Sequence, residues 1–255
     1  MPEMEFSEKL EAIARAGAGV NNIPLDRCAK AGIVVFNTPG ANANAVKELV
    51  LCGMLLASRN VPAALTWAKG LTEDVSKTVE KGKSQFAGHE ILGKTLGIVG
   101  LGAIGRKVAE AAKALGMNIV GYDPYYVSGG EGLTVYPDLA EMLPLCDIVT
   151  LHLPANDATK GMVNKEFLAS MKDGAILLNF SRDKLVNDVD LLVALESGKL
   201  TQYVTDFPND NLIGREHITL LPHLGASTAE AEDNCATMAV MELRDYFENG
   251  NIINS

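Results

Sequence analysis

A glycine-rich turn between two apolar segments constrains the fold of this chain more than any other feature. Residues 95–99, TLGIV, form a short apolar run that is typical of a strand covered on both faces. The turn GLGAIG follows at residues 100–105, and apolar residues then recur at helical spacing as far as Leu115. Gly116 stands where a helix end favours a residue that tolerates positive φ. The pattern predicts a strand, a tight turn and a helix, followed by a second strand over residues 119–122.

The spacing of the glycines suits a bound dinucleotide. Gly100 permits the sharp turn, Gly102 lets the backbone approach a pyrophosphate, and Gly105 lets the helix pack closely on the strand. Ala103 and Ile104 would lie in the first turn of the helix, where free N–H groups and the positive dipole end favour phosphate. We therefore expect these five residues to bind the cofactor.

Asp123 indicates which dinucleotide is bound. It stands 18 residues after Gly105, at the end of the second predicted strand, where a carboxylate can accept both ribose hydroxyls of the adenosine. The same charge repels a 2′-phosphate, so the sequence favours NAD over NADP. A glycine pattern alone is a weak signal. Here the strand, the helix and the terminal Asp are all in register with it.

Composition and charge argue against several other classes of protein. The 255 residues, 47% of them hydrophobic, are enough for a large core and one or two domains. A net charge of −10 argues against a nucleic-acid partner, because that affinity comes largely from Lys and Arg. No apolar run approaches the roughly 18 to 20 residues that span a bilayer, and the N-terminus is acidic rather than signal-like. We expect no membrane partner.

The cysteines and histidines show no ligand spacing. Cys28, Cys52, Cys146 and Cys235 are scattered without a C-x-x-C motif, and the four His residues are dispersed. Neither a disulfide framework nor a metal site is predicted. We interpret the cysteines as buried small residues in a reducing compartment and predict a cytoplasmic location.

The rest of the chain alternates between strand and helix patterns, which predicts an α/β fold with a doubly wound parallel sheet. Further strands are expected over residues 12–15, 33–36, 148–153, 175–180, 202–206 and 218–221, and helices near residue 25 and over 43–58, 139–143, 166–171, 188–197 and 226–248, the last capped by Ser227 or Thr228. The polar residues 65–88 suggest an arm or loop at the surface or at a subunit contact. Ligands of such sheets bind outside the carboxyl ends of the strands. Five polar side chains follow such ends: Asp123, His152, Arg182, Asp206 and His223.

Seven segments together are similar to one known family. They are ARAGAGVNNI, VFNTPGANANAVKELV, GKTLGIVGLGAIGRKVA, GYDP, DIVTLHLP, LLNFSR and LPHLGAST. In order and spacing, over about residues 4–246, they resemble the D-isomer-specific 2-hydroxyacid dehydrogenases. Within that family they look most like the members that oxidise D-3-phosphoglycerate in serine biosynthesis. The resemblance implies an NAD-dependent oxidoreductase with a small-molecule substrate.

The resemblance also implies the domain organisation. A Rossmann NAD domain over residues 41–223 would be inserted into a flavodoxin-like substrate domain. That substrate domain would comprise residues 1–40 and the C-terminal helix in residues 224–255. The family pattern implies a homodimer formed through the NAD domain, which suits the apolar stripe of residues 43–58 and the polar arm after it.

The resemblance assigns the catalytic and nicotinamide-binding residues. His223 corresponds to the base that takes the hydroxyl proton as the hydride leaves, and His is the side chain suited to that role near neutral pH. Arg182 corresponds to the arginine that grips the substrate carboxylate, and Asp206 to the residue that holds the nicotinamide carboxamide. Taken alone, Arg182 could be a surface arginine and His223 a structural histidine.

Further contacts follow from the same resemblance. His152 and Pro154 would lie beside the adenine, and the remaining cofactor positions are Phe180, Ser181 and Gly225. The backbone N–H groups of Ala18 and Gly19 match the loop that binds the substrate carboxylate, and Arg15 would be near a substrate phosphate. Arg15 could equally pair with a neighbouring acid.

One departure from the family concerns the partner of the catalytic His. The family places a Glu beside it, in a D-V-F-x-x-E-P type segment that reads TDFPNDN here. Counting without a gap puts Asn211 at the Glu position, whereas aligning the Phe-Pro pair puts Asp210 there. Asp210 is preferred as the third catalytic residue because it preserves the charge.

A second departure concerns the substrate domain. A flavodoxin-like domain needs about five parallel strands, but only two precede the hinge signal NTPG. The chain therefore looks N-terminally shortened by roughly fifty residues compared with the family, either as a shortened product or as a reduced form of the domain. We expect NAD binding with weak or absent turnover. A different D-2-hydroxy acid as substrate and an NAD-sensing binding protein remain alternatives.

Overall fold

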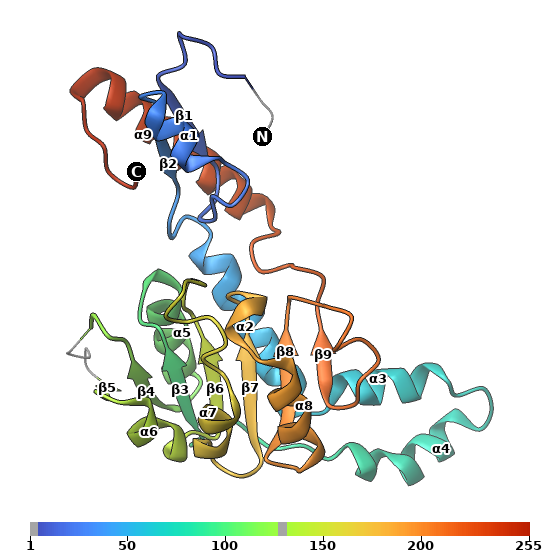
Figure 1. Ribbon diagram of the computed structural model, residues 1–255. Coiled ribbons are helices and arrows are strands. Elements are labelled where there is room, and N and C mark those ends of the chain that lie inside the picture. Colours follow the sequence, from blue (N-terminus) through green and yellow to red (C-terminus); the bar gives the residue numbers. More distant parts are fainter. Residues whose placement is uncertain (1–4, 127–131) are drawn as a thin grey trace. The chain divides into compact units, whose positions relative to one another are not determined.

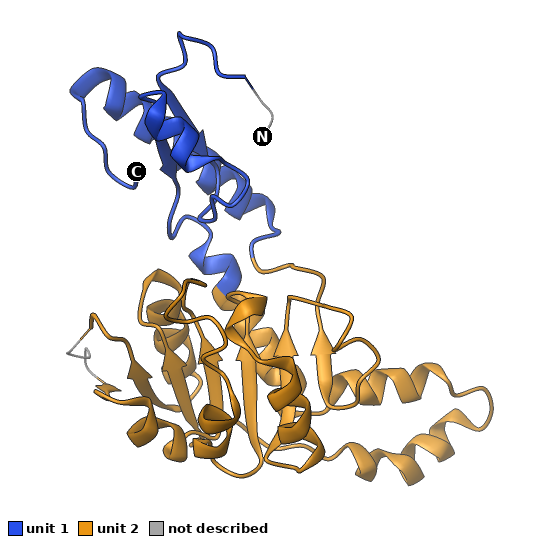
Figure 2. Cartoon of the chain, in the orientation of Figure 1, with its two compact units in different colours: residues 1–46, 226–255 blue, residues 47–225 orange. Residues whose placement is uncertain are grey.

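The protein divides into two compact units (Figure 2). A computed structural model describes residues 5–126 and 132–255. One unit combines residues 1–46 with 226–255, and the other is residues 47–225. We call them unit 1 and unit 2 and describe each by itself.

Unit 2 is built on a seven-stranded sheet in which every neighbouring pair is parallel, in the order β5-β4-β3-β6-β7-β8-β9. Its strands are β3 (Thr95–Val99), β4 (Asn118–Tyr122), β5 (Leu133–Val135), β6 (Ile148–Leu151), β7 (Ala175–Asn179), β8 (Leu200–Thr205) and β9 (Ile218–Leu220). The order reverses between β3 and β6, which makes the sheet doubly wound, as the sequence predicts. The edge strand β5 was not expected, and the strand predicted over residues 148–153 ends at Leu151.

Helices cover both faces of this sheet. They are α2 (Ala43–Ser58), α5 (Ala103–Ala114), α6 (Leu139–Met142), α7 (Lys165–Ser170) and α8 (Asp188–Glu196), with short 3-10 turns η2 (Leu143–Leu145) and η3 (Asp183–Leu185). In Figure 1, α7 and α8 lie in front of the sheet and α2 lies behind it. The chain winds from β3 to β4 in one direction and from β6 to β8 in the other. Right-handed crossovers therefore place α5 on the face opposite α7 and α8.

The core of unit 2 explains why the apolar runs form strands. Leu96, Ile98 and Val99 are fully buried, because β3 lies at the centre of the sheet and is covered on both faces. The apolar stripe of α2 is also buried, as expected. Gly53 is required there, since an added Cβ would lie 2.7 Å from Cζ of Phe180.

The polar segment after α2 is a helical arm. It consists of α3 (Val61–Lys69), α4 (Val75–Gly82) and the 3-10 turn η1 (Lys83–Phe86), and Figure 1 shows α3 and α4 as a hairpin that extends beyond the sheet. The sequence predicts an arm or loop here, and none of the three elements has a buried residue. The arm has its own small apolar contact, because the rings of Trp67 and Phe86 lie 5.3 Å apart.

Unit 1 contains a two-stranded parallel sheet in its described residues. Strands β1 (Ala12–Arg15) and β2 (Val34–Asn37) pair with each other, α1 (Leu25–Lys30) joins them, and α9 (Ala229–Asn249) packs against both. The ring of Phe36 in β2 lies 5.7 Å from that of Tyr246 in α9. Of the two predicted caps for α9, it is Thr228 whose side chain accepts the N–H of Ala231.

All four cysteines lie in described parts of the chain, and all are free thiols. Cys28, Cys146 and Cys235 are buried as expected, but Cys52 is exposed on α2. The prediction for Cys52 was wrong because its position lies on the outer face of that helix. Within residues 5–126 and 132–255, no cluster of three His, Cys, Asp or Glu could hold a metal ion. Across the same residues, no single helix is long and apolar enough to cross a membrane; α2 and α3 pass that test only together, with a bend of 68° between them.

Candidate active site

The glycine turn lies at the point where the strand order of the sheet reverses. Gly100 follows β3 with φ of 100°, and its N–H donates to the carbonyl of Tyr122 over 2.8 Å. A Cβ at Gly100 would lie 2.3 Å from the carbonyl oxygen of His152, at the end of β6. Only glycine fits both the backbone angle and this close approach.

The other two glycines of the turn differ in the space around them. A Cβ at Gly105 would lie 2.0 Å from the carbonyl oxygen of Gly100, so this glycine lets α5 approach the turn. A Cβ at Gly102 would meet nothing within 4 Å. Gly102 precedes the first helical residues, Ala103 and Ile104, whose N–H groups have no partner within an α-helix. The open space therefore lies at a helix N-terminus, where a pyrophosphate binds favourably.

Asp123 is held against the glycine turn. Its Oδ2 accepts the N–H of Leu101 over 2.8 Å, and its Oδ1 accepts the N–H of Tyr125 over 2.9 Å. Each carboxylate oxygen can accept a second hydrogen bond. The side chain thus lies at the end of β4, beside the turn, with acceptor capacity left for the hydroxyls of a ribose.

His152 is an uncharged side chain in the wall of this region. Its Nε2 lies 3.1 Å from Oγ1 of Thr150, its Nδ1 is buried, and burial lowers the pKa of the ring to about 3. A ring that stays neutral near pH 7 suits contact with an aromatic base rather than proton transfer. Pro154 follows on the exposed loop, where its carbonyl accepts the hydroxyl of Thr159 over 2.6 Å.

Arg182 is positioned by a buried asparagine. Oδ1 of Asn179 accepts the N–H groups of Ser181 and Arg182 over 3.1 and 3.4 Å, and its Nδ2 donates to the carbonyl of Arg182 over 2.8 Å. The hydroxyl of Ser181 donates to the carbonyl of Leu151 over 2.6 Å. The turn after β7, in which Phe180 is also buried, is therefore fixed on two sides. Sequence reasoning missed the role of Asn179, although a polar residue closing an apolar strand was a usable signal.

Asp206 is the centre of a cluster at the carboxyl ends of β7, β8 and β9. Its Oδ2 accepts the N–H of Gly225 over 2.9 Å, and its carbonyl accepts the N–H of His223 over 2.9 Å. Burial raises the pKa of this carboxyl, while the Gly225 N–H and the charges of His223 and Arg182 oppose the rise. Arg182 follows β7 and His223 follows β9, the two neighbours of β8, so both residues come from strands beside the one that ends at Asp206. Its Oδ1 is buried and has no partner among the described residues.

His223 has an unusual backbone and an aromatic neighbour. Its φ is 53°, in the left-handed region, and the side chain is exposed. The ring of Phe207 lies 4.8 Å from the imidazole. Sequence reasoning also missed Phe207, which follows Asp206 directly and could have been noticed for that reason. Strained positions of this kind persist where the surroundings fix them, often at functional sites.

The loop that holds the two candidates for the partner of His223 is anchored on α8. Nδ2 of Asn211 donates to Oδ2 of Asp188 over 2.9 Å, and Nδ2 of Asn209 donates to the same oxygen over 3.1 Å. Asn211 is thus committed to Asp188, whereas Asp210 is exposed between the two asparagines. Asp210 stays a prediction as the third catalytic residue.

The predicted substrate residues of unit 1 share one loop. Arg15 is the last residue of β1. Its guanidinium occupies the space beside Gly17, because a Cβ added to Gly17 would lie 1.7 Å from Nη1 of Arg15. The N–H of Gly17 donates to the hydroxyl of Thr38 over 2.6 Å, and the carbonyl of Ala18 accepts Nδ2 of Asn37 over 2.6 Å. The loop that carries Ala18 and Gly19 is therefore tied to the hinge residues. Its role in substrate binding stays a prediction.

Together, these features define a dinucleotide-binding domain of the Rossmann type, with an Arg, an Asp and a His gathered at the carboxyl edge of its sheet. The chain belongs to the D-isomer specific 2-hydroxyacid dehydrogenase family, whose NAD binding domain matches residues 51–225.

Similar proteins agree with this assignment. The chain is 38% identical over 250 residues to D-3-phosphoglycerate dehydrogenases of Methanocaldococcus jannaschii and Homo sapiens, covering 94% of this chain and 46% and 45% of those proteins. Among solved structures, a D-mandelate dehydrogenase of Rhodotorula graminis matches with a TM-score of 0.84 at 27% identity, over 94% of this chain and 72% of that chain. A glyoxylate reductase of Paecilomyes thermophila matches with a TM-score of 0.82 at 30% identity, over 97% and 75%. The chain spans about half the length of the curated relatives that it matches.

Proposed function

We propose that this protein is an NAD-dependent dehydrogenase that oxidises D-3-phosphoglycerate, the step that begins serine biosynthesis. The observation that carries the proposal is the cluster of Arg182, Asp206 and His223 at the same edge of the sheet as the open glycine turn. The likeness to D-3-phosphoglycerate dehydrogenases supports the choice of substrate. Another D-2-hydroxy acid would use the same cluster.

The residues of unit 2 fit NAD. The space beside Gly102 leaves room for the pyrophosphate, and Asp123 has acceptor capacity for a ribose. The buried Oδ1 of Asp206 has no donor among the described residues, and the carboxamide N–H₂ of nicotinamide would supply one. When bound, NAD supplies the nicotinamide C4 that accepts a hydride from the alcohol carbon of the substrate.

The side chains around Asp206 would then bind the substrate and move its proton. Arg182 binds the substrate carboxylate through its planar pair of donors and polarises the reacting oxygen. His223 takes the hydroxyl proton while the hydrogen on the alcohol carbon leaves as hydride, so the alcohol becomes a ketone. Asp210, a carboxylate on the loop after β8, would stabilise the imidazolium that results.

Turnover is tested by mixing the 255-residue chain with NAD and D-3-phosphoglycerate, D-glycerate or D-lactate and recording the absorbance of NADH. The expected result is slow NADH formation that is fastest with D-3-phosphoglycerate and at least about a hundredfold slower still in His223→Asn. His217→Asn is the matched control and should keep the rate, because His217 is exposed and lies just before β9, at the opposite end of that strand from His223. Equal rates for the three substrates would overturn the substrate choice, and an unaffected His223→Asn would overturn the mechanism.

The partner of His223 is tested by its effect on pH dependence. Asp210→Asn removes the proposed charge, so the rate should fall and its pH profile should move. Glu216→Gln removes another exposed carboxylate between β8 and β9, so it is the matched control and should change little. An unchanged profile in Asp210→Asn would remove Asp210 from the site.

A second candidate function is NAD binding with little turnover. It is favoured by the thin sheet of unit 1, where two strands are described and no residue of β1 is fully buried. The same assay separates the two functions: NAD binding without NADH formation from any of the three acids supports this candidate.

We also propose a homodimer formed through unit 2 and a cytoplasmic location. The outer face of α2 exposes Leu55, at 43%, and the arm exposes Leu65 and Val75, at 53% and 50%. Apolar residues gathered on one helix and a neighbouring arm favour burial against a second copy. Sedimentation should show a dimer that Leu55→Glu weakens and Val189→Glu, exposed on α8, leaves intact. The four free thiols fit a reducing compartment.

A further inference from the structure

A cavity lies at the edge of the sheet opposite the glycine turn. It has a volume of about 460 Å³ and is lined by the first residues of β6, β7 and β8, by the end of α2, and by the segment between the arm and β3. The strands of this sheet all run in one direction, so their amino ends lie at one edge and their carboxyl ends, with the candidate active site, lie at the other. The length of the strands separates the cavity from that site. The volume is within the range of sites for small molecules, about 300 to 1,000 Å³.

The wall of the cavity is built by a close contact between α2 and the chain that returns from the arm. The N–H of His89 donates to the carbonyl of Ser58 over 2.8 Å. Gly88 is required at this contact, because a Cβ there would lie 2.2 Å from the same carbonyl oxygen. Asn60, with φ of 51°, lies between α2 and α3. Its Oδ1 accepts Nε2 of Gln202 over 3.2 Å, which joins this wall to β8.

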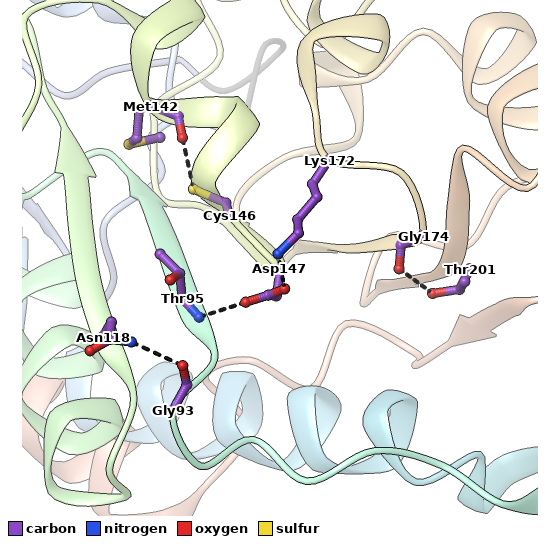
Figure 3. Close-up of polar contacts among 9 residues, drawn as sticks. All are labelled: Gly93, Thr95, Asn118, Met142, Cys146, Asp147, Lys172, Gly174 and Thr201. Atoms are coloured by element: carbon purple, nitrogen blue, oxygen red, sulfur yellow. Dashed lines mark hydrogen bonds and ion pairs between the residues drawn. The ribbon is translucent and has the colours of Figure 1, made fainter.

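Most charged groups around the cavity are already paired. Figure 3 shows Asp147 between two donors: Nζ of Lys172 at 2.7 Å and the N–H of Thr95 at 2.9 Å. Asp173 pairs with Lys199 over 2.7 Å. The carboxylates of Asp147 and Asp173 are therefore already paired with lysines, so they are not candidates for binding a cation.

Two groups of the lining are not matched in the same way. Ser58 is 5% exposed, and its Oγ is buried with no hydrogen-bond partner in the described chain. A buried hydroxyl without a partner costs free energy that a ligand could recover. Lys94 is half-buried and forms no ion pair within 4 Å of a described carboxylate, although its charge contributes to the lowered pKa of Asp147. Glu90 is exposed at the rim, where solvent screens its charge, and His89 is exposed beside it.

We propose that this cavity is a binding site for a small organic or inorganic anion, held by an ion pair with Lys94 and a hydrogen bond with Ser58. Carboxylate and phosphate groups share this chemistry, and both are compact enough for a cavity of this size. The site is distinct from the proposed NAD and substrate residues, so it does not depend on the proposed reaction.

The test uses the 15N-labelled protein titrated with succinate and, separately, with inorganic phosphate. Saturable changes are expected in the amide signals of Gly174, Thr201 and Gln202, which line the cavity. Lys94→Met should weaken the response at least about tenfold, while Lys165→Met, at an exposed position on α7, should not. The stronger of the two probes identifies the preferred anionic group.

Ser58→Ala separates a ligand role from a structural role. Because the hydroxyl has no partner, its removal should leave the melting temperature unchanged or raise it, while anion affinity falls. The proposal is overturned by linear responses to both probes, by equal responses in the native protein and Lys94→Met, or by a loss of stability in Ser58→Ala. Signals that move with protein concentration alone would also overturn it, since this face would then be a contact between copies.

Discussion

The carboxylate of Asp206 accepts the backbone N–H of Gly225 over 2.9 Å, which ties the end of β8 to the loop that carries His223. The carbonyl of Asp206 reinforces this tie by accepting the N–H of His223. Burial makes this carboxylate expensive to ionise, and the charges of His223 and Arg182 oppose that effect. Its charge state should therefore affect both the stability of unit 2 and the site.

The stability of the protein should depend on the titration of Asp206. Burial raises the pKa of this carboxyl above the usual value of 3.8, which it regains on unfolding. The folded state therefore binds a proton more readily, and the buried charge opposes folding at pH values above the folded pKa. That penalty disappears as the pH falls through the folded pKa. Asp206→Asn should raise the melting temperature relative to the native protein at about pH 7, with a difference that shrinks toward about pH 4.

Thermal unfolding followed by circular dichroism across that range measures the effect. Asp210→Asn is the matched control, because this carboxyl is exposed on the same loop. A difference for Asp206→Asn that stays constant with pH would contradict the assignment of a raised pKa.

Cofactor preference should depend on Asp123. Asp123→Ser removes the charge beside the glycine turn, so NAD affinity should fall at least about tenfold, or about 1.4 kcal/mol, and NADP affinity should rise. Fluorescence titration with both cofactors measures the change. Asp138→Ser removes another carboxylate that accepts a backbone N–H, that of Ala140, away from the turn, and should alter neither affinity. NADP binding that stays equally weak in Asp123→Ser would show that the carboxylate does not select the cofactor.

Gly100→Ala should destabilise unit 2. The new Cβ would meet the carbonyl oxygen of His152 at 2.3 Å, and φ of 100° disfavours any other residue, so a loss of about 1 to 3 kcal/mol is expected. Urea unfolding measures the loss. Gly102→Ala, with nothing within 4 Å of its Cβ, is the control and should retain its stability. Equal stability of the two variants would mean that the turn can relax.

The thiol of Cys146 should be inert in the folded protein. Burial raises its pKa to about 12, with a smaller contribution from the charge of Asp147, so almost no thiolate forms near neutral pH. Maleimide labelling followed by peptide mass mapping should leave Cys146 unmodified until denaturant is added. Modification of the native thiol as fast as that of the exposed Cys52 would show that the base of β6 opens readily.

The local parts of the fold were predictable from the sequence. The turn from Gly100 to Gly105 and the helix end at Gly116, which has φ of 83°, follow from residues close together in the chain. The helices of the arm were not predicted as helices. Because α3 and α4 bury no residue, their sequences lack the long apolar stripe of a core helix. Strand β5 was missed because it has three residues at the edge of the sheet.

The contacts that position the site were less predictable. Phe207 contacts His223 only when β8 and β9 are side by side, so this pair could not be read from the sequence. Asn179 is local to Arg182, three positions away, but its hydrogen bonds depend on the conformation of the turn after β7. The cavity at the opposite edge is harder still, because Ser58 and Lys94 are 36 positions apart and come together through the return of the chain from the arm. Sequence patterns show which residues face a core, but they do not show which residues far apart in the chain line the same cavity.

The most direct test of the account is calorimetric titration of NAD into the native protein and into Gly102→Val. Gly102 has φ of −69°, which valine tolerates, and its Cβ would occupy the open space assigned to the pyrophosphate. The account predicts saturable binding of one NAD per chain in the native protein, and loss of that binding in a variant that unfolds at the same temperature. Absence of binding to the native protein, or equal binding to Gly102→Val, would contradict the central claim.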